Sequence, residues 1–347
     1  MFRCVVYTEL MKEEWDTFVI GKGTVFHTIA FRQILIHSFG YTCRYHVILD
    51  QHNDISAIIP LIVGRNLSLV KVGVSLPFVN YMDICADSEN AFQFAIDSLI
   101  EIKSKYKLGY IELRLKDQSL GSTSWSVNLH HHTFVLPLLD DEEKVLSYSS
   151  SSNRNHVRKV YKHNLFSVSF DRSHLESFHK VYVTRMKQLG SPAQDIQFFR
   201  NFFIYLPDQA NLLTVLDNQT GRVVGGMLLL SSLGNSTLYY PYGANLAEYN
   251  KKHLNNFMYW EAVRFGIRNG FHFLDLGRSQ TGSGTYKYKQ QWGATAEQLK
   301  YLVYDGGSKS YSPPDKQSLG FFVELWKITP RFITDTVGKK LIKYLLP

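Results

Sequence analysis

The chain has 347 residues, of which 45% are hydrophobic and 20% are charged, and this balance excludes an intrinsically disordered protein. Its 38 basic and 30 acidic residues give a formal net charge of +8, which favours an anionic partner without requiring one. Its three cysteines show no C-x-x-C spacing, and the sequence shows neither the apolar core of a signal peptide nor a bilayer-length apolar run. We therefore expect no disulfide framework and a cytoplasmic location.

The predicted elements form two halves with the same order. In the first half, a hairpin of strands over 45–50 and 55–63 is followed by a short strand, a helix and a strand over 77–81, 90–106 and 110–115. The second half repeats this order over 212–217, 222–230, 240–245, 254–269 and 271–276. The hairpins match without a gap, because Asp217 and Val223 each lie 167 positions after their counterparts Asp50 and Ser56. The repeat predicts a mixed α/β protein that binds ligands at the splayed carboxyl ends of its parallel strands, the alternative being two unrelated units.

Two segments of loop-like composition divide the chain. A polar, serine-rich segment over 140–164 separates the halves and leads into a helix, and a Gly/Ser/Pro segment over 305–316 detaches a C-terminal tail. We therefore expect a first lobe over 1–145, a second lobe over 146–305, and a loop with a C-terminal amphipathic helix over 306–347.

Several motifs resemble one known family. The second half contains DLGRS at 275–279, GSGTY at 282–286 and YKQQWG at 288–293, and the chain also contains Phe26-His27 and LWKITP at 325–330. Together they resemble the FemAB family, and most closely the FemAB-like proteins found with bacterial exosortase and exopolysaccharide gene clusters. The resemblance covers nearly the whole chain, and it implies two tandem GNAT-like lobes of the acyl-CoA N-acyltransferase type that share one cleft.

The resemblance also implies an activity. FemAB proteins move an amino acid from aminoacyl-tRNA to the amine of a nucleotide- or lipid-linked cell-wall precursor, whereas related single-lobe enzymes take acyl groups from coenzyme A. This chain has no long heptad stretch for the helical arm that meets tRNA in some members. It also lacks the acyl-CoA signature Q/R-x-x-G-x-G/A, with YNKKHL at 249–254 in its place.

We therefore expect an acyltransferase that acts on an anionic precursor of the cell envelope or of exopolysaccharide, with aminoacyl-tRNA and acyl-CoA both open as donors. A charged tRNA is then a candidate partner, and no metal is needed. Two alternatives remain: an acyl-CoA-dependent N-acyltransferase of an amino sugar, and a double lobe that binds a glycan or a membrane assembly without catalysis.

Lys289 is the first candidate catalytic residue. The family places a lysine after an aromatic residue beside the reacting carbonyl, and Tyr288-Lys289 matches this pattern. A fixed ammonium group stabilises the oxyanion of acyl transfer more than it stabilises the neutral ground state. Without the resemblance, a solvated loop lysine would be the simpler interpretation. In the first half, Tyr81 and Asp83 are expected on the acceptor side, where Asp83 would orient or deprotonate the amine unless it only caps a turn.

The same motifs predict substrate-binding residues. Arg278 and Ser279 follow a strand end, and arginine offers a fork suited to phosphate or carboxylate. An ion pair between Arg278 and Asp275 is the structural alternative. Tyr288 and Trp292 lie in the YKQQWG motif at 288–293, and we expect them to bind substrate as well.

Two basic segments are candidate anion sites. Arg154, Arg158 and Lys162 recur every fourth residue with Lys159 beside them, so a helix would present them as one stripe toward phosphates. A solvated helix face is the commoner meaning of this pattern. Lys251 and Lys252 precede a predicted helix whose N-terminus would attract the donor's phosphates, unless they form a plain surface turn.

Two further patterns are weaker. Three successive histidines at 130–132 cannot chelate one metal from a regular strand, because neighbouring side chains point to opposite faces, so we expect no metal site. The tail over 330–346 combines an apolar side with three lysines. It predicts either peripheral contact with the inner face of the membrane or, more commonly, a helix packed on its own domain.

Overall fold

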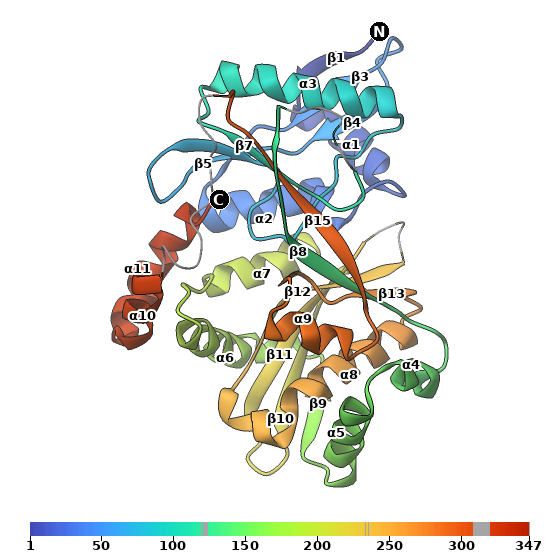
Figure 1. Ribbon diagram of the computed structural model, residues 1–347, viewed down its shortest axis with the longest axis vertical. Coiled ribbons are helices and arrows are strands. Elements are labelled where there is room, and N and C mark those ends of the chain that lie inside the picture. Colours follow the sequence, from blue (N-terminus) through green and yellow to red (C-terminus); the bar gives the residue numbers. More distant parts are fainter. Residues whose placement is uncertain (119, 121–123, 233, 235, 308–319, 347) are drawn as a thin grey trace.

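The computed structural model describes residues 1–118, 120, 124–232, 234, 236–307 and 320–346 (Figure 1). Most of the loop predicted over 305–316 lies outside these described residues. The first half consists of β1 (Arg3–Val6), α1 (Lys12–Val19), α2 (Ile29–Phe39), β2 (Thr42–Cys43), β3 (His46–Leu49), β4 (Ile55–Ile59), β5 (Ile62–Arg65), β6 (Lys71–Val74), α3 (Glu89–Tyr106) and β7 (Ile111–Leu115). The second half consists of α4 (Glu142–Tyr148), α5 (Ser151–Lys162), β9 (Phe166–Ser169), α6 (Leu175–Gln188), α7 (Ile196–Tyr205), β10 (Ala210–Asp217), β11 (Val223–Ser231), β12 (Thr237–Asn245), α8 (Leu254–Arg268), β13 (Phe273–Asp275), β14 (Ser279–Gln280) and α9 (Gly284–Gln290).

The two halves have matching strand pairings. Strands β1, β3 and β4 pair antiparallel, as do β9, β10 and β11. In each half a later strand then pairs in parallel across a helix, β6 with β7 and β12 with β13. The mixed α/β fold with two tandem lobes, predicted from the sequence repeat, is therefore confirmed.

Two details of the first half differ from the prediction. The strand predicted over 55–63 is divided into β4 and β5 around Pro60, because proline has no N–H to continue the ladder. The strand predicted over 77–81 is wrong: these residues form a turn, in which Phe78 has a φ of 64°. The counterpart of β12 is β6, which ends before Pro77.

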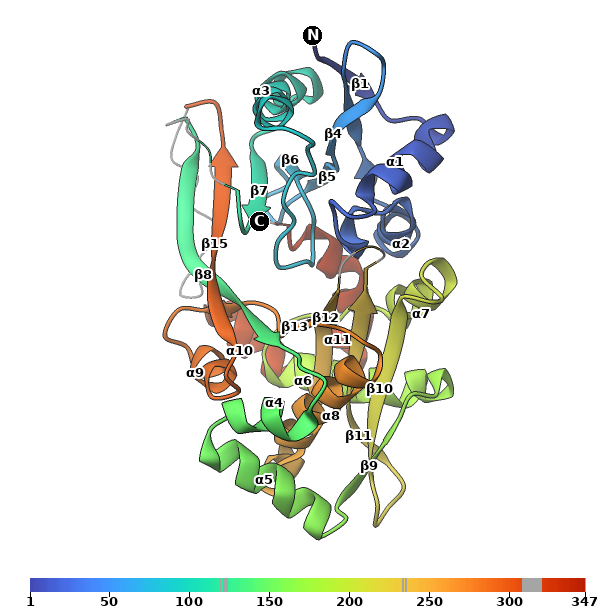
Figure 2. The same cartoon turned by 90° about the vertical axis from the view of Figure 1, so that its right-hand side faces the viewer.

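Two long strands connect the lobes, β8 (Ser126–Pro137) and β15 (Thr295–Tyr304). Strand β8 follows the first half in sequence but pairs with β13 of the second, whereas β15 follows the second half and pairs with β7 of the first. They also pair with each other, and Figure 2 shows them side by side along the length of the molecule. Among the described residues, this exchange joins most strands of both lobes into one 12-stranded sheet.

The lobes also meet through aromatic side chains of α2 and α7. Phe31 of α2 lies edge-on to Phe202 of α7, with 6.0 Å between ring centroids. Phe198 and Phe202 also contact Tyr242 of β12. These rings are buried, so the junction is part of the hydrophobic core and holds the two lobes in one arrangement.

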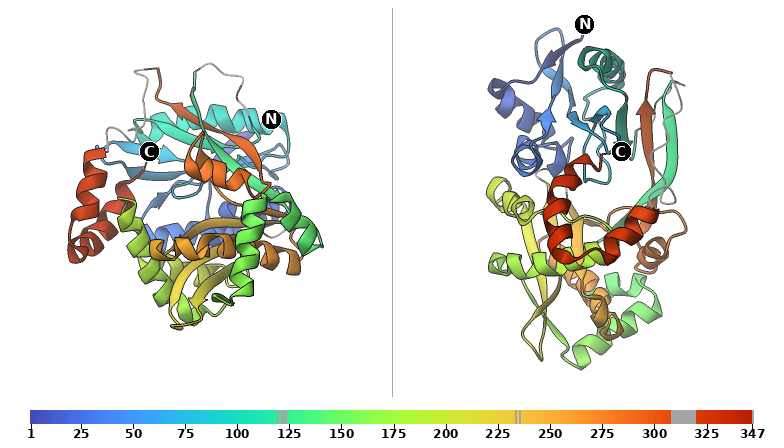
Figure 3. Two further views of the ribbon diagram at one scale, coloured as in Figure 1. Left: turned by 60° about the horizontal axis from the view of Figure 1, so that its bottom comes forward. Right: turned by 90° about the vertical axis from the view of Figure 1, so that its left-hand side faces the viewer.

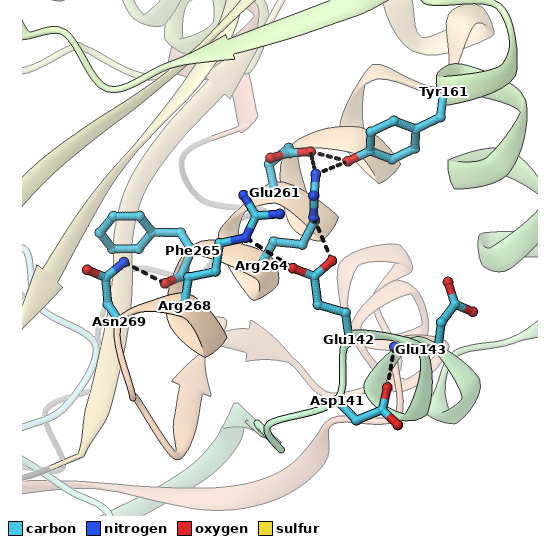
Figure 4. Close-up of polar contacts among 9 residues, drawn as sticks. All are labelled: Asp141, Glu142, Glu143, Tyr161, Glu261, Arg264, Phe265, Arg268 and Asn269. Carbon is cyan, nitrogen blue, oxygen red and sulfur yellow. Dashed lines mark hydrogen bonds and ion pairs between the residues drawn. The ribbon is translucent and has the colours of Figure 1, made fainter.

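The segment between the halves is helical over much of its length, because α4 and α5 occupy it. Figure 4 shows how it is attached to α8. The guanidinium of Arg264 donates to Glu142 of α4 at 2.8 Å, to Glu261 at 2.9 Å and to the Tyr161 hydroxyl of α5 at 2.9 Å. Arg268 donates to Glu142 at 3.1 Å. This network holds α4 and α5 in place against α8.

The C-terminal segment forms a helical hairpin of α10 (Gly320–Ile328) and α11 (Arg331–Leu341), followed by the 3₁₀ helix η5 (Ile342–Tyr344). Figure 3 shows the hairpin lying across one side of the molecule. Ile342 and Leu346 are buried, and the Tyr41 hydroxyl of the first lobe donates to the Lys343 carbonyl at 2.8 Å. In the described part of the chain, no helix has the length and apolar character that a membrane span requires.

Candidate active site

The best-connected polar residue at the lobe junction is Asp275, the last residue of β13. Its carboxylate accepts hydrogen bonds from the Tyr81 hydroxyl at 2.6 Å, from the Thr133 hydroxyl at 2.8 Å and from the Gly277 N–H at 2.6 Å. The side chain is 2% exposed, and burial raises the pKa of Asp275. The donors come from the first lobe, the exchanged strand β8 and the second lobe, so Asp275 connects all three.

Lys289 lies beside this carboxylate. Helix α9 buries its side chain and directs the ammonium group to the carbonyls of Gly277 at 2.8 Å and Arg278 at 3.1 Å. An ammonium group has three N–H donors, and these carbonyls use two of them. Burial lowers the pKa of Lys289 to about 8, against the opposing effect of the Asp275 charge. The group is therefore a desolvated cation near neutral pH, not a solvated loop lysine.

Arg278 and Ser279 occupy the loop that follows Asp275. The exposed Arg278 donates to the Tyr301 hydroxyl of β15 at 2.9 Å, so its hydrogen bond goes to this tyrosine and not to Asp275. Tyr301 donates in turn to the Asn80 carbonyl at 2.6 Å, which ties the loop to the first lobe. Ser279 is buried in β14, and its hydroxyl has no hydrogen-bond partner among the described residues.

Tyr288 and Trp292 form an aromatic cluster beneath Lys289. Both pack against Tyr259 of α8, with ring centroids 5.2 Å and 5.8 Å from it. Trp292 is 2% exposed, so it packs in the core between α9 and Tyr259 and does not line an open surface. Tyr259, which the sequence motifs did not indicate, joins α8 to this aromatic cluster.

A small hollow lies at the lobe junction. Its walls come from the first lobe and from the strand ends of the second, and its lining residues are Phe26, Val79, Asn80, Tyr81, Tyr239, Tyr240, Pro241 and Asp275. Tyr81 and Asp275 thus both line this hollow. Asp83 is placed differently, because its carboxylate accepts the N–H groups of Lys116 and Asp117 at 2.8 Å and 3.3 Å and so shapes a turn of the first lobe.

The two predicted basic segments lie next to each other. The His156 ring of α5 stacks on the His253 ring, which precedes α8, with 3.9 Å between centroids. Lys159 and Lys162 are exposed, whereas Arg158 pairs with Glu143 at 3.5 Å and Arg154 donates to the Ser147 carbonyl at 3.2 Å.

The segment before α8 adds Lys251, which is exposed, and Lys252, which pairs with Asp217 at 3.2 Å. Helix α8 has no side-chain cap, and its first turn contains no acidic residue. Its N–H groups and the flanking cations therefore form a surface that favours anions.

Comparisons with known proteins agree with this fold. Residues 151–290, which run from α5 to α9, match the model of the acetyltransferase (GNAT) domain family. The crystal structure of FemX has a similar fold, with a TM-score of 0.68 and 15% identity over 86% of this chain and 96% of FemX. The chain therefore has the fold of tandem GNAT proteins, and the GNAT family match covers its second lobe.

Two further solved structures share the tandem GNAT fold. A tandem GNAT protein from the clavulanic acid biosynthesis pathway matches with a TM-score of 0.57 and 9% identity. The match covers 89% of this chain and 100% of that protein. The C-terminal domain of a putative lysylphosphatidylglycerol synthetase from Agrobacterium fabrum matches with a TM-score of 0.58 and 11% identity, over 90% and 94% of the two chains. No curated protein matches by sequence.

The candidate site therefore combines a buried cation, a buried carboxylate and a phenol. Asp275, Thr133 and Tyr301 were not predicted as site residues. The signal for Asp275 was a carboxylate at the end of an otherwise apolar strand, whereas nothing local marks Thr133 or Tyr301. Among the residues that the structure describes, no group of three or more His, Cys, Asp or Glu side chains is placed to hold a metal ion.

Proposed function

We propose that this protein transfers an acyl or aminoacyl group to an amine of a phosphate-bearing precursor of peptidoglycan or exopolysaccharide. The observation that carries the proposal is the Lys289 ammonium group, which is buried beside Asp275 and uses two of its three donors on backbone carbonyls. In a desolvated site, such a donor stabilises the oxyanion of a tetrahedral intermediate far more strongly than it would in water.

In the proposed reaction, residues 1–145 hold the acceptor amine and residues 146–305 hold the acyl donor. The amine attacks the acyl carbonyl, and the third N–H of Lys289 stabilises the resulting oxyanion. The amine's proton passes to the Tyr81 oxygen while Tyr81 gives its own proton to Asp275, to which it is already bonded at 2.6 Å. The raised pKa of Asp275 favours this uptake. The intermediate then expels the donor's thiolate, or its ribose oxygen, which takes the proton back from the Tyr81–Asp275 pair and leaves as a hydroxyl.

The second lobe is the better candidate for donor binding. Its helix α8 begins without acidic residues beside Lys251 and Lys252. The matching helix of the first lobe, α3, is capped by Ser88 and has Glu89 in its first turn, which repels anions. The phosphates of acyl-CoA or the 3′ end of aminoacyl-tRNA are therefore expected at α8, with the stripe from Arg154 to Lys162 beside them.

The donor can be identified directly. Purified protein is incubated with an amine-bearing precursor and either labelled acetyl-CoA or tRNA charged with a labelled amino acid, the latter with and without ribonuclease. We expect transfer of label from one of the two donors. Transfer from tRNA that ribonuclease abolishes assigns an aminoacyltransferase, whereas transfer from acetyl-CoA assigns the amino-sugar N-acyltransferase alternative. Absence of transfer from both donors, with every precursor class supplied, would contradict the proposal.

The pKa of Lys289 predicts the pH dependence of the reaction. The pKa of this side chain falls from 10.5 to about 8, so the catalytically useful ammonium form predominates below pH 8 and is lost above it. We expect kcat to fall with rising pH through about 8. The Lys289→Arg variant, whose guanidinium stays charged, is expected to show no fall in this range. A wild-type profile that stays flat well above pH 8 would exclude the ammonium group from the rate-limiting step.

The acceptor class also suggests a location. A lipid-linked acceptor would hold the enzyme at the inner face of the membrane, and the tail over 330–346 remains our candidate for peripheral contact. The structure alters which of its residues are free for this role, because Ile342 and Leu346 are buried against the first lobe.

A further inference from the structure

The hairpin of α10 and α11 uses one of its sides to pack on the protein. Val323 of α10 contacts Gly190 so closely that a Cβ added there would lie 2.4 Å from it. Trp326 packs on Gly338 of α11, where an added Cβ would lie 3.3 Å from its ring. Lys339 pairs with Asp195 at 2.6 Å. The inward side of the hairpin therefore contacts the second lobe through Val323 and Lys339, and a pocket lies between the two.

The outward side of the hairpin is also apolar. Leu325 and Ile328 lie three residues apart on α10, and their side chains are 46% and 78% exposed. Ile333 and Val337 lie four residues apart on α11, and their side chains are 38% and 44% exposed. Residues at these spacings share one face of a helix, so each helix has an apolar stripe turned away from the protein.

A helix with two apolar sides is usually covered on both. This hairpin is covered on one, and it projects from one side of the molecule, at the left in Figure 1 and facing the viewer in the right panel of Figure 3. A projecting ridge can reach a flat partner without hindrance from the rest of the fold. Scattered exposed apolar residues need no explanation, but these four are grouped on two successive helices of one hairpin.

The charges around this surface indicate the partner. Helix α11 and η5 carry Arg331, Lys339, Lys340 and Lys343 but a single acidic residue, Asp335. We propose that the outward face of the hairpin, formed by Leu325, Ile328, Ile333 and Val337, docks on an anionic membrane surface. Apolar side chains then enter the headgroup boundary, while the exposed Lys340, three residues after Val337, meets lipid phosphates. A second copy of the chain fits less well, because a two-fold contact through this face would set one basic helix α11 against another.

The docking surface would bring the proposed transferase to its lipid-linked substrates, and in that sense it rests on the proposed function. The test of the surface measures membrane binding and does not depend on transferase activity. Full-length protein is sedimented with vesicles of phosphatidylglycerol and phosphatidylcholine and with vesicles of phosphatidylcholine alone. We expect binding to the mixed vesicles that falls at high salt, and little binding to phosphatidylcholine. The double variant Ile328→Asp/Val337→Asp is expected to bind the mixed vesicles about tenfold more weakly or worse, because two apolar side chains no longer enter the lipid.

The matched control is Leu10→Asp, which adds a charge at a 94% exposed apolar residue of the first lobe and should bind as wild type does. Thermal unfolding checks that the double variant stays folded, and transfer to a water-soluble acceptor should be unchanged. Wild-type protein that does not bind the mixed vesicles, or a double variant that binds equally well, would overturn the inference. So would a wild-type dimer that the double variant dissociates, since a second copy would then cover the surface. Vesicle binding without any transferase activity would instead retain the surface and reject the proposed function.

Discussion

Replacement of Lys289 by methionine is expected to lower kcat by a factor of about 10² to 10³, or roughly 2.7–4 kcal/mol of transition-state stabilisation. Methionine fills a similar volume but supplies no N–H to the oxyanion. The effect should fall on kcat more than on KM, because the ammonium group gains most when charge develops in the transition state. The measurement is steady-state kinetics with whichever donor supports transfer.

The matched control is Lys287→Met, which removes an exposed lysine two residues earlier on the same helix and should leave kcat within a factor of about two, as surface substitutions usually do. Because Lys289 also holds the carbonyls of Gly277 and Arg278, loss of activity alone could reflect a displaced loop. Lys289→Arg tests this, since it keeps a cation that can donate to the same carbonyls. Equal kcat values for Lys289→Met and wild type would remove the oxyanion role altogether.

The sequence was most informative where one local pattern determines one element. The gapless hairpin match at Asp50 and Asp217 predicted two related halves, and both contain the hairpin and the parallel strand pair that follows its helix. The strand at 77–81 failed because its aromatic residues resemble a strand whereas the left-handed Phe78 forms a turn. The exchange of β8 and β15 could not be predicted, because an alternating apolar pattern shows which face is buried but not which strand lies alongside.

The same limit applies to the site. Lys289 was indicated by a contiguous motif, and the structure places it beside a buried carboxylate at the lobe junction. Asp275 was interpreted only as a candidate ion-pair partner of Arg278, because its donors Tyr81 and Thr133 lie 194 and 142 residues away in sequence. Contacts between such distant residues depend on how the strands are ordered, which is the part of the fold that composition and spacing do not specify.

Asp275→Ala is expected to reduce the free energy of unfolding by about 3–5 kcal/mol, the usual cost when one partner of a buried charged network is removed. Three donors, on Tyr81, Thr133 and Gly277, would lose their common acceptor, and each unsatisfied buried group costs about 1–3 kcal/mol. Because these donors connect both lobes through β8, the loss should weaken the junction as well as the loop. Urea denaturation of both proteins measures it, and Asp117→Ala, at a side chain that is 74% exposed, should change the free energy by less than about 1 kcal/mol.

Asp275→Asn separates this structural role from proton transfer. Burial raises the pKa of Asp275 because it disfavours the charged carboxylate, so a neutral amide of the same size should be tolerated better than alanine. An amide cannot take the proton that Tyr81 would pass on, however, so we expect the asparagine variant to retain most of its stability while its kcat falls by about 10². An asparagine variant with full kcat would show that Asp275 only positions Tyr81 and the loop. An alanine variant as stable as wild type would mean that water replaces the carboxylate, and the junction would then owe its rigidity to the aromatic contacts between α2 and α7.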